Sequence, residues 1–148
     1  MNKVEVVEAC KAMLQNKLKQ LQQEQSEVRA GASDQGKSTA GDKHETAMAM
    51  AQLEQEQNQQ LQDQILKQLS IMQQPRWLEP SHSGGPGALI STDQGYFFIA
   101  IALGKIEVHS TTVMTLSMAS PLGKQFENCS IGQQLKMGNT PLVVNGIE

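Results

Sequence analysis

The sequence predicts an α+β protein: an N-terminal antiparallel helical hairpin (a coiled coil) followed by a small strand-rich domain with one short helix. Three observations lead to this prediction. Apolar residues recur at heptad spacing near the N-terminus, prolines and glycines cluster after residue 74, and short β-branched and aromatic runs follow. We therefore divide the chain into a hairpin (1–74), a linker (75–87) and an α+β domain (88–148).

The first helix is predicted over residues 4–28. No glycine or proline occurs before Gly31, and glutamine, glutamate, lysine and leucine all favour helix. The apolar residues that define its narrow stripe lie seven apart: Val7, Leu14, Leu21 and Val28. Such a stripe is typical of a coiled coil, and the helix would be roughly 40 Å long.

A second helix is predicted over residues 41–73, after a turn rich in glycine, serine and alanine at 30–41. Its apolar positions lie near its two ends, and residues 54–60 between them are almost wholly polar. Two helices of similar length joined by a short turn form an antiparallel hairpin, whose middle we expect to be weakest. The alternative is a disordered or aggregation-prone glutamine-rich segment, which we favour less because glutamine is a good helix former.

After the linker the pattern becomes that of strands. We expect a short helix to begin at Ser120, with the serine as N-cap and Pro121 in the first turn, and to end near residue 128. The predicted strands cover residues 88–92, 96–102, 105–109, 111–118, 134–137 and 142–147. The resulting domain of about 60 residues is close to the lower size at which domains fold unaided.

Charge and cysteine content limit the possible partners. The net charge is −3, and neither half is basic: residues 1–78 hold 9 Lys and Arg against 10 Asp and Glu, and residues 79–148 hold 3 against 5. We expect weak or no independent nucleic-acid binding, because such binding depends on a basic surface. Cys10 and Cys129 lie far apart and suit a reducing compartment. No apolar run is long enough for a bilayer and no leader is evident, so we expect a cytoplasmic protein without a membrane partner.

The sequence contains no self-contained active site. His44-Glu45 begins like a zinc-protease motif, but Met48 occupies the place of the second histidine. No nucleophile elbow and no phosphate-binding glycine loop occurs. We expect a protein that is not an enzyme and has no cofactor of its own.

One pair of acidic residues is a candidate site. Asp42 and Glu45 are three residues apart at the start of the second helix, so both carboxylates should lie on one face, at the end of the hairpin. Two such carboxylates can hold Mg²⁺ when another molecule supplies further ligands. The alternative is structural: Thr39 to Asp42 fits a capping box, and acidic residues in a first turn suit the helix dipole. Spacing alone favours the cap.

The same segment resembles a known family. Residues 41–47 (GDKHETA) are similar to the G-D-x-x-E-N-A tip motif of the Gre-type transcript cleavage factors, and the hairpin context matches. Downstream, Ser120-Pro121-Leu122-Gly123 and Ile131-Gly132 resemble a segment of the family's C-terminal domain. The resemblance implies an FKBP-like fold for residues 88–148.

The resemblance also implies a function. Gre-type factors bind RNA polymerase, insert the hairpin into its secondary channel and stimulate the polymerase's own cleavage of backtracked RNA. Asp42 and Glu45 would then share the Mg²⁺ of the polymerase active centre, meeting the RNA 3′ end only indirectly. Ser120 and Pro121 would lie near the docking surface.

Several positions depart from the family pattern. Thr46 replaces an asparagine, the segment Met48-Ala49-Met50 lacks an expected aromatic residue, and Gln133-Gln134 replaces a Gly-Asp pair. The alternatives are therefore a non-catalytic coiled-coil interaction protein or a channel-binding inhibitor of RNA polymerase. A peptidyl-prolyl isomerase is a third alternative, but it rests on fold analogy alone.

Overall fold

The structure is a computed structural model that describes the backbone of residues 1–35 and 41–148 and the side chains of residues 1–30 and 45–148. Two long helices precede a six-stranded sheet with one short helix, which confirms the α+β prediction. The chain forms two compact units, Leu14–Ser70 and Met1–Met13 with Ile71–Glu148. None of the helices within the described ranges is long and apolar enough to cross a bilayer.

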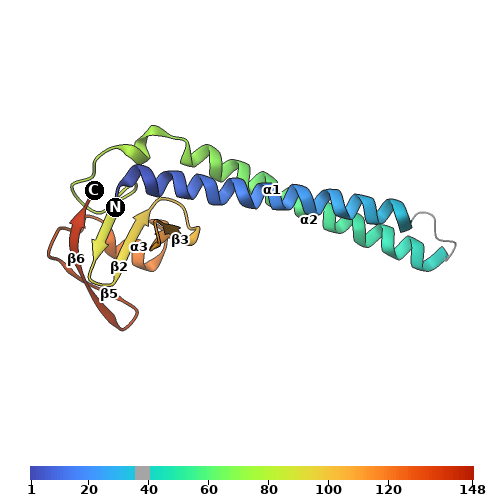
Figure 1. The fold of residues 1–148 in the computed structure, drawn as a ribbon. Helices are drawn as coiled ribbons and strands as arrows, with labels where there is room; N and C mark the ends of the chain where they lie inside the picture. The colour runs from blue at the N-terminus through green and yellow to red at the C-terminus, as the bar shows by residue number, and fades with distance from the viewer. Residues whose placement is uncertain (36–40) are drawn as a thin grey trace. The chain divides into compact units, whose positions relative to one another are not determined.

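The first unit is a helical hairpin. Helix α1 (Lys3–Gln35) has 33 residues and helix α2 (Gly41–Met72) has 32, and the two run side by side (Figure 1). Helix α1 continues seven residues beyond its predicted end, so the predicted turn over 30–41 is wrong for residues 30–35, which are helical. Alanines at positions 30 and 32 favour helix there. Hydrogen bonds cross between the helices: the Asn58 side chain donates to the Leu21 carbonyl oxygen at 2.8 Å.

The less exposed residues of this hairpin form a coiled-coil seam. They recur at alternating steps of four and three residues, which keeps them on one face of each helix. On α1 the seam residues are Leu14, Leu18, Leu21, Gln25 and Val28; on α2 they are Ala51, Gln55, Asn58, Gln62, Ile65 and Leu69. The seam of α2 is therefore apolar near its C-terminal end and polar in its middle.

The linker contains one ordered turn. The 3-10 helix η1 (Pro75–Leu78) buries Trp77, whose Nε1 donates to the Ile71 carbonyl oxygen at 2.6 Å. The Arg76 guanidinium lies 4.3 Å from the centre of the indole ring. Trp77 is the anchor of this turn, whereas Leu78 is 47% exposed.

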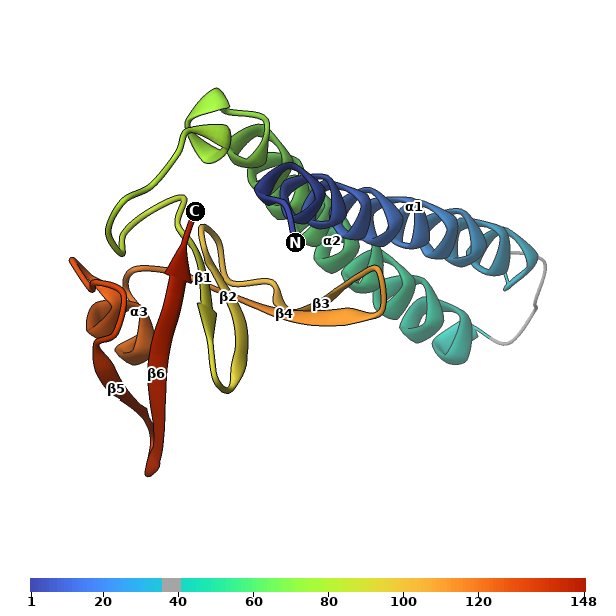
Figure 2. The ribbon, with the colours of Figure 1, turned by 60° about the vertical axis from the view of Figure 1, so that its left-hand side comes forward.

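The six strands are joined in the order β3-β4-β2-β1-β6-β5. Strands β2 and β4 pair in parallel, with Tyr96 opposite Val113, and the other neighbours are antiparallel (Figure 2). Their bounds are β1 Leu89–Thr92, β2 Gly95–Ile99, β3 Gly104–Val108, β4 Thr111–Leu116, β5 Gln134–Met137 and β6 Thr140–Ile147.

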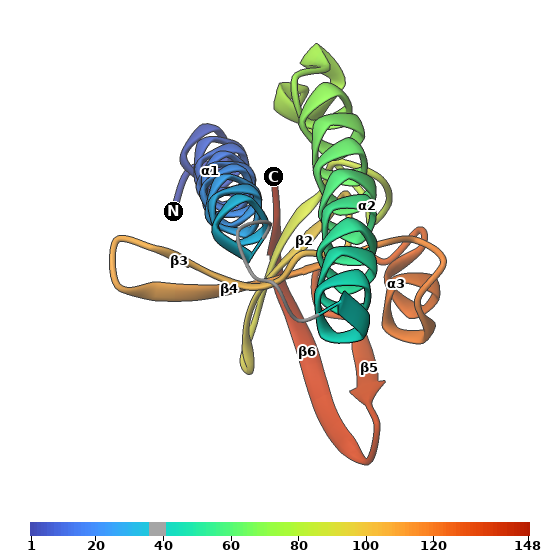
Figure 3. The same cartoon turned by 90° about the vertical axis from the view of Figure 1, so that its right-hand side faces the viewer.

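Helix α3 (Pro121–Phe126) lies beside β5 (Figure 3), and its Phe126 side chain belongs to the core of the sheet. The rings of Phe126 and Phe97 have their centroids 5.2 Å apart. Helix α3 ends two residues before the predicted end, because Asn128 has a φ of 58°, outside the helical region. Other buried members of the core are Ile90, Ile99, Leu116, Cys129, Leu142 and Val144.

Candidate functional site at the start of the second hairpin helix

The acidic pair lies in the opening residues of α2. This helix begins at Gly41, so Asp42 is its second residue and Glu45 its fifth. The Glu45 side chain is exposed to solvent. The Asp42 side chain and Thr39, the proposed capping residue, lie outside the described residues. The choice between a helix cap and a pair of free carboxylates therefore stays a prediction for Asp42.

An exposed glutamate at this position can act as an external ligand. Mg²⁺ takes about six oxygen ligands, and one carboxylate supplies at most two of them. An ion at Glu45 would therefore take most of its ligands from elsewhere. Within the described side chains, no three His, Cys, Asp or Glu residues come together to hold a metal ion.

The second predicted site, at Ser120 and Pro121, has a clear structural role. The Ser120 hydroxyl accepts from the Gly123 backbone N–H at 2.9 Å and donates to the Ser117 carbonyl oxygen at 2.7 Å. A Cβ added at Gly123 would overlap that same carbonyl oxygen. The Ser-Pro-Leu-Gly segment thus builds the start of α3. Because the serine hydroxyl is engaged within the chain, the exposed Pro121 ring is the part free to meet a partner; the docking role stays a prediction.

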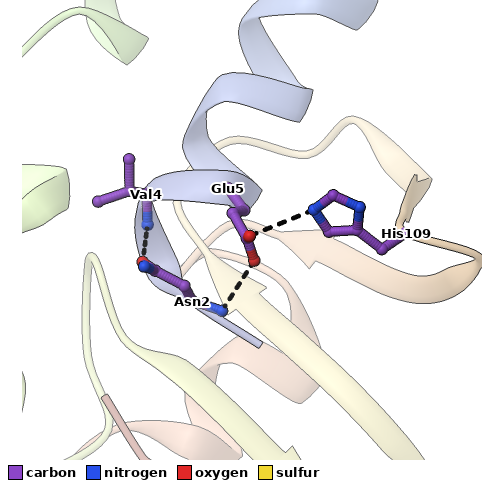
Figure 4. A network of polar contacts seen from close by, with 4 residues as sticks. All are labelled: Asn2, Val4, Glu5 and His109. Carbon is purple, nitrogen blue, oxygen red and sulfur yellow. Dashed lines mark hydrogen bonds and ion pairs between the residues drawn. The ribbon is translucent and has the colours of Figure 1, made fainter.

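The N-terminus of α1 carries a capping box that sequence reasoning did not predict. The Asn2 Oδ1 atom accepts from the Val4 N–H at 2.8 Å, and Glu5 Oε2 accepts from the Asn2 N–H at 3.3 Å (Figure 4). The other oxygen, Glu5 Oε1, lies 3.2 Å from His109 Nε2. His109 belongs to the turn between β3 and β4. The Glu5 carboxylate therefore caps α1 and also contacts this turn.

Next to this box, Lys3 is buried at 3% exposure. Its Nζ donates to the Glu79 carbonyl oxygen at 2.6 Å and to Ser81 Oγ at 3.3 Å. Burial lowers the pKa of Lys3, and the nearby charges of Glu148 and Glu79 oppose that shift.

Both cysteines are buried, and neither forms a disulfide. Burial raises the pKa of the Cys10 thiol to about 12 and also raises the pKa of Cys129. A thiol with a raised pKa forms little thiolate at neutral pH, so neither cysteine is suited to nucleophilic chemistry.

The polar seam residues Asn58 and Gln62 were also missed. A sequence signal for them exists: both fall on the four-and-three spacing that connects Ala51 to Leu69. The surrounding run of glutamines hid that spacing, because most of its members face solvent.

No protein-family model matches the chain, and no curated protein matches it. A solved structure, that of the transcription factor Gfh1, is similar to it, with 16% sequence identity and a TM-score of 0.39. The similarity covers 94% of this chain and 93% of that one.

Proposed function

We propose that this chain is an RNA polymerase-binding transcription elongation factor that stimulates cleavage of backtracked RNA. The observation that supports it is the exposed Glu45 at the start of α2, in a hairpin of two helices of 33 and 32 residues. At 1.5 Å per residue, each helix is close to 50 Å long. A hairpin of that length is suited to entering the secondary channel and presenting Glu45 at its end.

The proposed chemistry needs an ion that the polymerase supplies. Metal-bound water ionises far more readily than bulk water, and Mg²⁺ is bound by carboxylate oxygens. Glu45 would supply one carboxylate and Asp42 the second. The protein would hold no cofactor of its own and would act as a non-enzymatic factor.

The test uses purified polymerase in stalled, backtracked complexes. Addition of the chain should speed the release of short 3′ RNA fragments, and Asp42→Ala or Glu45→Ala should abolish that gain. Glu54→Ala, at an exposed acidic residue further along α2, is the matched control and should behave like the wild type. No effect of the wild type on cleavage would contradict the proposal.

A channel-binding inhibitor is the second candidate. Met48 and Met50, 43% and 54% exposed, occupy the segment where the Gre-type pattern has an aromatic residue. An inhibitor would bind polymerase and slow RNA synthesis without speeding cleavage. The same complexes, assayed for both activities, distinguish the two functions.

A further inference from the structure

The middle of the hairpin seam is built from amide side chains. Asn58 and Gln62 are 9% and 6% exposed, although a coiled coil ordinarily places apolar residues at such positions. The next seam residues, Ile65 and Leu69, are 7% and 8% exposed. The amides are thus as deeply buried as the apolar residues that follow them.

These amides are joined to each other and to α1. Gln62 Nε2 donates to Asn58 Oδ1 at 2.6 Å and to Gln25 Oε1, on α1, at 3.1 Å. Asn58 Nδ2 donates to the Leu21 carbonyl oxygen at 2.8 Å. Gln25 Nε2 in turn donates to Gln59 Oε1, back on α2, at 3.3 Å. Among the described side chains, every buried polar atom of this group has a hydrogen-bond partner.

We propose that Gln25 and Gln62 form a register lock that fixes the axial position of α2 against α1. Asn58 supports Gln62 but does not select a register, because it donates to a backbone carbonyl oxygen and every turn of α1 offers one. An apolar seam tolerates a slip of one heptad, because the slip exchanges one apolar neighbour for another. Here, a slip that placed Leu18 instead of Gln25 opposite Gln62 would break the hydrogen bond between Gln62 and Gln25 and leave one N–H of the buried Gln62 amide facing an apolar side chain. The buried N–H left without a partner disfavours the slipped register roughly 10- to 100-fold.

The lock has a consequence for the end of the hairpin. A slip of one heptad moves α2 by about 10 Å along α1. Gln25 and Gln62 would therefore help to decide where the first residues of α2, including Glu45, lie relative to α1. This inference concerns the free protein, so it stands or falls independently of any role at the polymerase.

The test measures the distance between spin labels on the full chain. Cysteines introduced at the exposed residues Ser26 and Gln60 carry the labels. The native Cys10 and Cys129 are buried, with raised thiol pKa values, and should stay unlabelled. The variant to compare with this labelled parent combines Gln25→Leu and Gln62→Leu, and Gln55→Leu is the control. Gln55 is a seam residue outside the described amide network.

We expect one distance in the labelled parent and in the Gln55→Leu control. The double variant should keep or raise its thermal midpoint, because leucine favours the seam, and should show a second distance about 10 Å away. A single, unchanged distance in the double variant would overturn the register lock. Loss of its helical circular dichroism would overturn it too, since the amides would then be needed for folding itself.

Discussion

At the scale of single residues, two adjacent glycines in the linker have opposite environments. The Gly84 N–H donates to the Cys129 carbonyl oxygen at 3.0 Å, and its own carbonyl accepts from the Asn128 N–H at 2.9 Å. A Cβ at Gly84 would overlap the Phe126 carbonyl oxygen and lie 2.6 Å from Cys129 Sγ. A Cβ at Gly85 would have nothing within 4 Å. Packing therefore requires a glycine at position 84 but not at position 85.

We predict that Gly84→Ala lowers the free energy of unfolding by about 2–4 kcal/mol, because backbone atoms must shift to admit the methyl group. Gly85→Ala should leave it unchanged or raise it by up to about 1 kcal/mol, through a less flexible unfolded chain. Urea unfolding of both variants checks the pair. Equal losses at the two positions would contradict the close packing at Gly84.

Lys3 gives a pH dependence with a definite sign. Its pKa is lowered in the folded chain, so the unfolded chain binds more protons between that lowered pKa and the ordinary value of 10.5. The contribution of Lys3 to the free energy of unfolding should therefore increase as the pH rises from the lowered pKa towards 10.5. Lys3→Met should remove this contribution, whereas Lys19→Met, at an exposed lysine, should retain it. Urea titrations from pH 8 to 10.5 measure the free energy of unfolding of both variants. If it rises with pH as strongly in Lys3→Met as in the wild type, Lys3 is not the source of the pH dependence.

At the scale of elements, the turn between β3 and β4 is strained. His109 and Ser110 have φ values of 48° and 65°, a left-handed conformation that two-residue hairpin turns require and that Asn-Gly adopts most easily. We predict that Ser110→Gly raises the free energy of unfolding by about 1 kcal/mol, because glycine adopts this φ without a Cβ clash. A thermal melt measures it. Ser130→Gly, at a residue without positive φ, should give no such gain.

The elements themselves were largely predictable from the sequence. The second helix was predicted over 41–73 and found at Gly41–Met72, and the strand at Gln134–Met137 was predicted at its observed bounds. Local pattern suffices for such features, because periodicity and turn residues act within a few positions. The strand order and the parallel pairing of β2 with β4 depend on contacts distant in sequence, which the pattern does not encode.

The candidate site was predictable only in part. The position of Glu45 at the start of a helix was predicted from the glycine, serine and alanine content of the segment before it, and its exposure agrees with that position. The roles of Ser120 and Gly123 in building α3 depend on Ser117, and the burial of Lys3 depends on Glu79 and Ser81. These partners become visible only when the chain is folded.

At the scale of the whole molecule, the chain combines a hairpin with a polar seam and an α+β unit with its own apolar core. The division into 1–74, 75–87 and 88–148 stays a prediction. The compact unit around the sheet also contains Met1–Met13 and Ile71 onward, which includes the first turns of α1. A fragment that begins at residue 88 would therefore lack Lys3 and Trp77, both of which are buried in this unit.

In the proposed function, the start of α2 reaches the catalytic ion of RNA polymerase. The most direct measurement replaces the Mg²⁺ of the polymerase with iron(II), which generates hydroxyl radicals that cut nearby protein backbone. We predict cuts in the bound chain close to Glu45, at the start of α2, and no such cuts without polymerase. Cuts confined to residues 88–148, or a bound chain that stays intact, would contradict the claim.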